Sequence, residues 1–175
     1  MATLNFKTEF PWGEPTYFVP KIWRALREIN GMHDEYLEYS AQAVITENDD
    51  ILSAFFPIKD FDKITRKIHT IRKDEKNLWY PGRKFHMVIF NRTKKRFQFA
   101  PVLECVSVQK ICIIRNFLIN KIKVIRVFVD HKELDFYERR RLSYNDGFNS
   151  INDFFRFFDQ KDFTGKIIHW TDFLY

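Results

Sequence analysis

The sequence predicts an α+β fold built on a small, strongly curved sheet or barrel, and three observations lead to it. Aromatic residues make up 18% of the 175 residues, with 20 Phe, which favours strands and a Phe-rich core. Hydrophobic residues make up 45%, which excludes a disordered chain. Five or six short strand-like runs are interspersed with two or three helical patterns. We expect residues 1–175 to form one domain.

The N-terminal part predicts an extended segment followed by a helix. Residues 4–10 have extended character, and the Pro and Gly residues that follow break the segment. Residues 16–28 place their large apolar side chains at helical spacing. Thr16 is a candidate cap, and Pro20 falls in the first turn of the predicted helix.

An acidic insertion is predicted at about residues 30–62. Between Glu28 and Ile58 there are seven carboxylates and no Lys or Arg. We interpret this segment as an insertion, helical near residues 34–43, that folds against a basic segment as an internal counter-charge.

The remaining elements follow from alternation, turn residues and caps. A strand at 68–72 precedes a long hairpin of 85–90 with 97–114, joined by the basic turn 91–95. Ser150 is the predicted cap of a short helix, with Asp153 as its box-like partner. The other predicted elements are a strand at 121–129, a helix at 134–142, a helix at 150–158 and a closing strand at 165–170.

The positive charge is concentrated in one segment. Between residues 63 and 96 there are 12 Lys or Arg against two carboxylates, whereas the rest of the chain holds 17 basic and 21 acidic residues. A patch of this kind attracts phosphates, which favours contact with nucleic acid or a nucleotide. The alternative is a solvated sheet edge that uses charge to prevent strand pairing.

The stretch from residue 63 to residue 84 is the strongest candidate site. It contains Lys67-x-x-Thr70-x-Arg72, in which Thr70 and Arg72 share one face of a strand. Lys67 has odd spacing and joins them only from a bend that leads into the strand. The alternative is an ordinary polar strand edge, because such spacing is common by chance.

The aromatic pair Trp79-Tyr80 follows within the same stretch. It lies among Lys73, Lys76 and Arg83, so it can stack a nucleic-acid base. The alternative is a pair packed over the mouth of the barrel.

Several function classes find no support in the sequence. The five His are scattered without zinc-site spacing, and no glycine-rich phosphate loop or G-x-S-x-G elbow is present, so we expect neither a metal nor a cofactor. No apolar run approaches the ~20 residues that span a bilayer, and the first ten residues lack the apolar region of a secretion signal. We therefore expect no membrane partner and a reducing cytoplasm, with Cys105 and Cys112 buried and inert.

The central stretch resembles the signature of ASCH domains. Residues 67–72 are similar to the G-x-K-x-x-T-x-R pattern of that family, with Trp79 and the segment 81–83 following. Further similarity lies at 15–19, at 145–148 and at 163–170, so the resemblance covers most of the chain outside the acidic insertion. The chain is similar above all to ASCH-like proteins of phages and prophages.

The resemblance implies a PUA-like barrel that binds RNA or a modified nucleoside. Some ASCH proteins are amidohydrolases that deacetylate N(4)-acetylcytidine, and others cut RNA. By this resemblance the catalytic residues are Lys67, Thr70 and Asp146, with Lys67 as the base that activates the Thr70 hydroxyl. The implied RNA-binding residues are His69, Arg72, Lys73, Trp79, Tyr80 and Arg83.

Two departures from the family pattern bear on the reaction rather than on the fold. Thr65 replaces the Gly of the motif, and Asp146 is one methylene shorter than the Glu of the amidohydrolases. Three hypotheses follow: a binding module for RNA or a modified nucleoside, a hydrolase of the amidohydrolase or ribonuclease type, and a phage-encoded protein-interaction domain.

Overall fold

The computed structural model describes residues 1–56, 64–119, 122–159 and 162–175, in which the chain forms five helices and nine strands. The helices are α1 (Phe18–Asn30), α2 (His33–Ile45), α3 (Asp49–Phe55), α4 (Phe136–Asn145) and α5 (Ile151–Phe157). The strands are β1 (Ala2–Asn5), β2 (His69–Arg72), β3 (Lys84–Ile89), β4 (Phe97–Gln98), β5 (Leu103–Glu104), β6 (Ser107–Ile119), β7 (Ile122–Val129), β8 (Lys132–Glu133) and β9 (Phe163–His169).

The strands form two sheets. The first has the order β1-β3-β4, with β5 also paired to β3, and β1 runs parallel to β3 with Ala2 opposite Phe85. The second is antiparallel with the order β2-β9-β6-β7-β8, and places His69 opposite His169. The predicted α+β class is confirmed. In the described residues neither sheet closes on itself, so the barrel stays a prediction.

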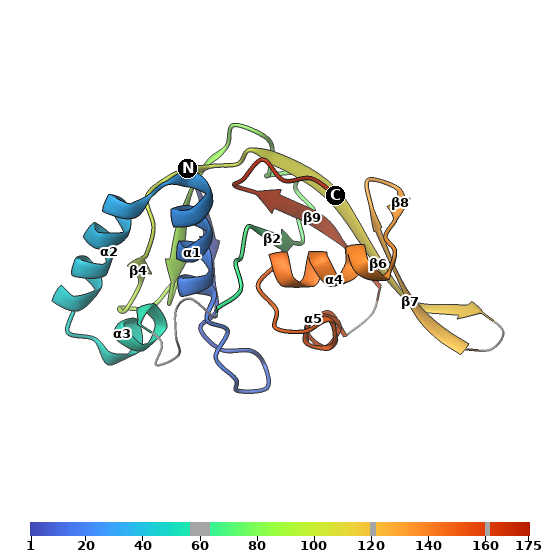
Figure 1. Cartoon of the computed structure of the whole chain (residues 1–175), viewed down its shortest axis with the longest axis horizontal. Coiled ribbons are helices and arrows are strands. Elements are labelled where there is room, and N and C mark those ends of the chain that lie inside the picture. Colours follow the sequence, from blue (N-terminus) through green and yellow to red (C-terminus); the bar gives the residue numbers. More distant parts are fainter. Residues whose placement is uncertain (57–63, 120–121, 160–161) are drawn as a thin grey trace.

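The helices form two groups (Figure 1). Helices α1, α2 and α3 lie together beside the first sheet, whereas α4 and α5 lie beside the second. The far ends of β6 and β7 run out beyond the rest of the molecule. The chain thus has two halves, and β2 with the segment before it runs between them.

The first helix forms as predicted, but its N-terminus is capped differently from the prediction. Ile22, Trp23 and Leu26 of its apolar face are fully buried, whereas Ile29 in the last turn is exposed. Pro20 is tolerated because the first helical turn has no intrahelical partner for its N–H groups. Thr16 is not the cap residue. Its Oγ1 donates to the Lys7 carbonyl at 2.7 Å and accepts from the Phe18 N–H at 3.3 Å, which ties the start of the helix to the segment after β1.

The predicted acidic insertion contributes to the core. The helix expected near 34–43 is confirmed as α2, and α3 follows it. Ala43, Ile51 and Phe55 are buried, and the Phe55 ring lies 6.4 Å from that of Trp23. Part of the proposed counter-charge is present, since Asp50 pairs with Lys95 of the basic segment. Residues 57–62 of the insertion lie outside the described residues.

One strand prediction is wrong. Residues 97–114 do not form one arm of a long hairpin, because β4 and β5 each pair only two residues with β3 and the chain then enters the other sheet as β6. Pro101, between β4 and β5, cannot donate to a ladder and interrupts the run. The strands predicted at 68–72, 121–129 and 165–170 are confirmed as β2, β7 and β9.

The two C-terminal helices are confirmed, with one change in their caps. Ser150 caps α5 as predicted, since its Oγ accepts from the Asp153 N–H at 3.0 Å. The reciprocal capping box is found instead at α4, between Asp135 and Glu138. Capping of this kind contributes about 1 kcal/mol of helix stability.

The core is rich in interlocking Phe rings, as predicted. Phe6 lies edge-on to both Phe18 and Phe99, and Phe148 contacts Phe10 and Phe18. Each such pair adds about 0.5–1.5 kcal/mol beyond its area burial. Both cysteines are free. Cys105 is buried, and burial raises the pKa of its thiol to about 11, while Cys112 is half-buried.

Candidate functional site

The buried centre of the molecule is an ion pair between Lys67 and Asp146. Lys67 Nζ lies 2.5 Å from Asp146 Oδ1 and also donates to the Asp146 carbonyl. The backbone closes the same contact through an isolated β-bridge between the two residues, and the Ile68 N–H donates to the Asn145 carbonyl at 2.9 Å. The side chains are only 2% and 4% exposed, so ligands do not reach them directly.

Burial moves both members of this pair toward their neutral forms. It lowers the pKa of Lys67 to about 8, against the opposing attraction of Asp146. It also raises the pKa of Asp146, against the attraction of Lys67 and Arg72. Removing two charges from water costs several kcal/mol per ion, and close pairing offsets part of that cost. Removing one member alone would therefore destabilise the fold, because the other charge would remain buried without its partner.

Thr70 and Arg72 lie beyond the pair on β2. Thr70 is buried opposite Ile168, and no described residue hydrogen-bonds to its hydroxyl, Lys67 included. Arg72 Nη2 donates to the Asn5 carbonyl at 2.8 Å, and its guanidinium lies 5.4 Å from the Phe6 ring centroid. The structure thus places Arg72 near the pair, but it does not couple Thr70 to Lys67.

His69 is buried in a relay of polar groups and is not at the surface. Asn145 Nδ2 donates to the Tyr175 hydroxyl at 2.9 Å, and that hydroxyl lies 2.7 Å from His69 Nε2. His69 Nδ1 lies 3.7 Å from Asp146 Oδ1, beyond hydrogen-bond distance, and has no described hydrogen-bond partner. Because His69 is fully buried, its expected contact with RNA is not available in this structure.

A row of polar side chains extends from His69 across the second sheet. His169 lies opposite His69 on β9 and opposite Ser107 on β6, with the two imidazole centroids 5.3 Å apart. Among the described residues neither ring nitrogen of His169 has a hydrogen-bond partner. Burial lowers the pKa of His169 to about 4, so this row is uncharged at neutral pH.

The sequence analysis missed a second buried lysine. Lys21 Nζ donates to the Gly147 carbonyl at 2.6 Å and to Asn149 Oδ1 at 3.0 Å, and the Lys21 carbonyl accepts from the Lys67 N–H. Lys21 therefore holds the loop that carries Asp146. A signal was present, because Lys21 is three residues after Phe18 and so falls on the apolar face of the predicted helix.

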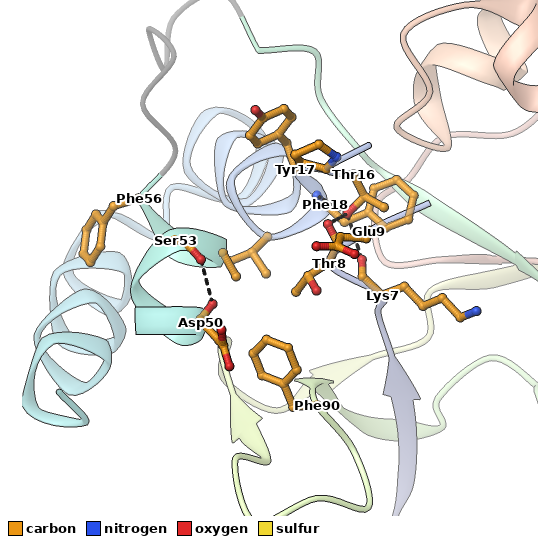
Figure 2. A pocket seen from close by; sticks show the side chains of 13 residues that line it. Lys7, Thr8, Glu9, Thr16, Tyr17, Phe18, Asp50, Ser53, Phe56 and Phe90 are labelled. Atoms are coloured by element: carbon orange, nitrogen blue, oxygen red, sulfur yellow. Dashed lines mark hydrogen bonds between the residues drawn. The ribbon is translucent and has the colours of Figure 1, made fainter. Parts of the chain in front are cut away.

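The accessible cavity (Figure 2) is lined by Phe18 but not by Lys67 or Asp146. It is a pocket of about 480 Å³ between the segment after β1, the start of α1, the helix α3 and the end of β3. The Phe90 ring points into the space, whereas the Phe56 ring is turned away from it. The lining residues are Lys7, Thr8, Glu9, Pro15, Thr16, Tyr17, Phe18, Val19, Asp50, Ser53, Ala54, Phe56 and Phe90.

Phe18 connects the pocket with the buried pair. Its ring lines the pocket, and the ring centroid lies 4.5 Å from Lys67 Nζ. A smaller hollow of about 240 Å³ adjoins the pocket along residues 5–9, and Asn91 lines it. The pocket was not predicted, since its wall comes from four segments that are distant in the sequence.

The predicted basic turn at 91–95 follows Phe90 directly, and it is taken together with Arg96 below as the basic turn (residues 91–96). Arg92, Lys94, Lys95 and Arg96 are all exposed there, and the turn contains no carboxylate. Lys95 pairs with Asp50 of the pocket wall, so the turn lies beside the pocket. The predicted positive segment thus includes a cluster of cations beside a cavity.

The predicted aromatic pair lies at the opposite end of β3. Lys84 begins that strand and Ile89 ends it, so Trp79 and Tyr80 precede β3 whereas Phe90 follows it. Trp79 packs against Phe85, while Tyr80 is 55% exposed. The structure therefore does not gather the predicted site residues into one cavity. Lys73, Trp79, Tyr80 and Arg83 belong to a separate surface.

Three further findings describe the chain as a whole. Within residues 1–56, 64–119, 122–159 and 162–175, no three His, Cys, Asp or Glu side chains gather so that they could hold a metal ion. No described helix is both long and apolar enough to cross a membrane. No protein-family model, curated protein or solved structure matches the chain.

Proposed function

We propose that this protein binds single-stranded RNA or a modified nucleoside, with a base in the pocket between α1 and α3. One observation carries the proposal: an aromatic-lined pocket of about 480 Å³ lies directly beside a turn with four exposed cations. Ligand pockets in proteins typically measure about 300–1,000 Å³. The cavity therefore suits a nucleoside.

The aromatic wall supplies the contact with the base. Phe90 points into the space and Phe18 lines it, so a base can stack on a ring already held by the core. Stacking on an aromatic side chain contributes about 1–3 kcal/mol per base and tolerates any sequence. Because the rings are packed in place, little conformational entropy is lost on binding.

The basic turn supplies the contact with the phosphates. Lys94 and Arg96 are exposed and have no carboxylate within the turn. Contacts of this kind release counterions from the nucleic acid, so the affinity falls as salt rises.

A fold consistent with this function is the PUA-like barrel of the ASCH domains. In this proposal the two sheets are the halves of a barrel that is open between β1 and β2. It is supported by the Arg72–Asn5 hydrogen bond, which joins those two edge strands. Lys67 and Asp146 then hold the barrel to its helices and do not contact the base.

A hydrolase acting on an acylated nucleoside or on RNA is the second candidate function. It is favoured by the lowered pKa of Lys67, about 8, and by the Phe18 ring, which lies against Lys67 and also lines the pocket. In this candidate, neutral Lys67 would accept the Thr70 proton and the Thr70 oxygen would attack the acyl carbon, after a rearrangement that frees Lys67 from Asp146 and brings the two side chains together. Thr70→Val keeps the volume and removes the hydroxyl. Release of cytidine from N(4)-acetylcytidine by the wild type and not by Thr70→Val would support this candidate.

The binding proposal is tested with a fluorescent oligoribonucleotide titrated at several salt concentrations. Lys94→Glu/Arg96→Glu reverses two charges beside the pocket, and Arg140→Glu/Arg141→Glu reverses two exposed charges on α4 as a matched control. We expect the first variant to weaken binding and to reduce the salt slope by about 0.7 for each phosphate that the protein no longer neutralises. Equal weakening in the two variants would show that only net charge matters and would overturn the proposed site.

A further inference from the structure

We infer that a bound RNA strand continues from the pocket along the outer face of β1 and β3 and stacks a second base on Tyr80. This inference rests on the proposed function and extends it to a second contact. The two surfaces are at opposite ends of β3, about 20 Å apart for six residues at ~3.3 Å each.

The face between the two ends exposes several polar side chains, although Val88 of β3, opposite Asn5, is buried within it. Thr3 of β1 lies opposite His86 of β3, so alternate residues on both strands share this face. Thr3, Asn5 and Lys84 are exposed on it, and Lys7 continues the line into the pocket wall. Hydroxyl, amide and cationic groups are those that contact phosphates and sugars. Glu104, which is exposed opposite Lys84 on β5, places one carboxylate on this face at its far end.

The loop at the far end (residues 74–83) is held rigidly. The Asp74 carboxylate accepts from the Leu78 N–H at 2.7 Å and the Trp79 N–H at 3.0 Å, and Lys166 Nζ lies 2.7 Å from it. The Gly82 N–H donates to the Cys105 carbonyl at 2.8 Å. A surface loop tied at both ends loses little entropy when it binds a ligand.

This rigid loop presents its large side chains to solvent. Leu78 is 48% and Tyr80 is 55% exposed, although the loop backbone is anchored. The Arg83 guanidinium lies 5.5 Å from the Tyr80 ring centroid, and Lys73, Lys76 and Lys84 are exposed nearby in the sequence. An exposed aromatic ring with cations around it is the platform on which single-stranded nucleic acids stack.

Oligonucleotides of different length distinguish binding at the pocket alone from binding at both contacts. We would measure binding of a labelled dinucleotide, which is too short to reach both contacts, and of a labelled strand of about sixteen nucleotides, the upper site size on small β-barrels. The long strand reaches both contacts, so we expect it to bind at least tenfold more tightly than the short one. Tyr80→Ala should weaken the long strand by about tenfold and leave the short strand unchanged.

A second pair of variants tests the path. Thr3→Glu places a negative charge on the outer face of β1, and Thr3→Gln is its uncharged control. We expect only Thr3→Glu to weaken the long strand, with the short strand unaffected by either. Thermal unfolding of each variant checks that the fold is retained.

The outcomes distinguish this inference from the proposal beneath it. If the short strand does not bind, the proposed function fails and the inference fails with it. If the short strand binds, but length and Tyr80→Ala have no effect, the second contact alone is overturned. The exposed Leu78 and Tyr80 side chains would then belong to a partner other than nucleic acid.

Discussion

Two lysine–aspartate pairs in this molecule differ in nearly every physical respect. The pair between Lys67 and Asp146 has side chains 2% and 4% exposed, whereas the pair between Lys95 and Asp50 has side chains that are each 52% exposed. The first lies behind Phe18, and the second lies at the wall of the pocket. The buried pair secures the junction of the two halves, while the exposed pair is free to exchange partners with a ligand.

The difference in exposure indicates which of the two regions a ligand can reach. Lys67 and Asp146 are the residues that the family resemblance makes catalytic, but in this structure their side chains are buried, and in the proposed binding function they have a structural role. The accessible chemistry is found at the aromatic pocket and the basic turn. Each prediction below tests that division, beginning with the largest expected effect.

Breaking the buried pair should have the largest effect. Lys67→Met leaves the Asp146 carboxylate buried and unpaired, so we expect the free energy of unfolding to fall by about 3–5 kcal/mol. Lys67→Met/Asp146→Asn removes both charges and should recover most of the loss. Urea denaturation measures both. A loss below about 1 kcal/mol for the single variant would show that the pair is not a lock.

The buried imidazole of His169 should make the protein sensitive to acid. Its pKa is about 4 in the folded state and about 6.5 in the unfolded state, so the unfolded state binds more protons between these values. Stability is therefore complete above about pH 6.5 and falls by up to about 3 kcal/mol as the pH drops to about 4. His69 also has a pKa lowered by burial and contributes to the same loss, while Asp130 opposes the shift of His169.

The measurement is urea denaturation at neutral pH and near pH 4.5. We expect His169→Gln to lose less stability between neutral pH and pH 4.5 than the wild type, by about 2 kcal/mol. Equal losses would assign the acid sensitivity to other groups.

Two glycines with the same backbone φ separate the effect of crowding at the buried pair from the effect of backbone strain. Gly147 and Gly13 both have φ of +88°, but a Cβ at Gly147 would lie 3.0 Å from Lys67 Cδ and 3.1 Å from the Phe18 ring, whereas none meets a neighbour at Gly13. We expect Gly147→Ala to cost about 1–3 kcal/mol more than Gly13→Ala. Equal unfolding free energies in the two variants would count against close packing around Lys67.

The exposed pair should give the smallest effect on stability. Lys95→Met removes a surface ion pair that contributes about 0–1 kcal/mol, so the denaturation midpoint should barely change. The same variant should weaken RNA binding, because it removes a cation beside the pocket. A large loss of stability would mean that the turn supports the core.

Local patterns predicted much of the fold. The apolar periodicity of α1 and the alternation of β2, β7 and β9 are properties of short segments, and all four were predicted. Barrel closure and the length of the β3 hairpin depend on which strands pair. Pro101 was the only local sign that the long arm would be divided.

The site was predictable only in part, for a related reason. The resemblance pointed to Lys67 and Asp146, which do meet, but their burial depends on Phe18 and on the tertiary fold. The pocket combines residues 7–9, 15–19, 50–56 and 90, whose proximity no local pattern encodes. The Tyr175 hydroxyl hydrogen-bonds to His69, although the two residues are more than a hundred positions apart in the sequence, and no motif indicated this contact.

One titration tests the central claim most directly. The short oligoribonucleotide is titrated against the wild type, Phe90→Ala and Thr70→Val, with folding of each variant checked by its thermal transition. If the pocket binds the base, Phe90→Ala loses the stacking energy of about 1–3 kcal/mol and Thr70→Val binds as the wild type does. Loss of binding in Thr70→Val, with Phe90→Ala unchanged, would contradict the account and return the site to the buried motif.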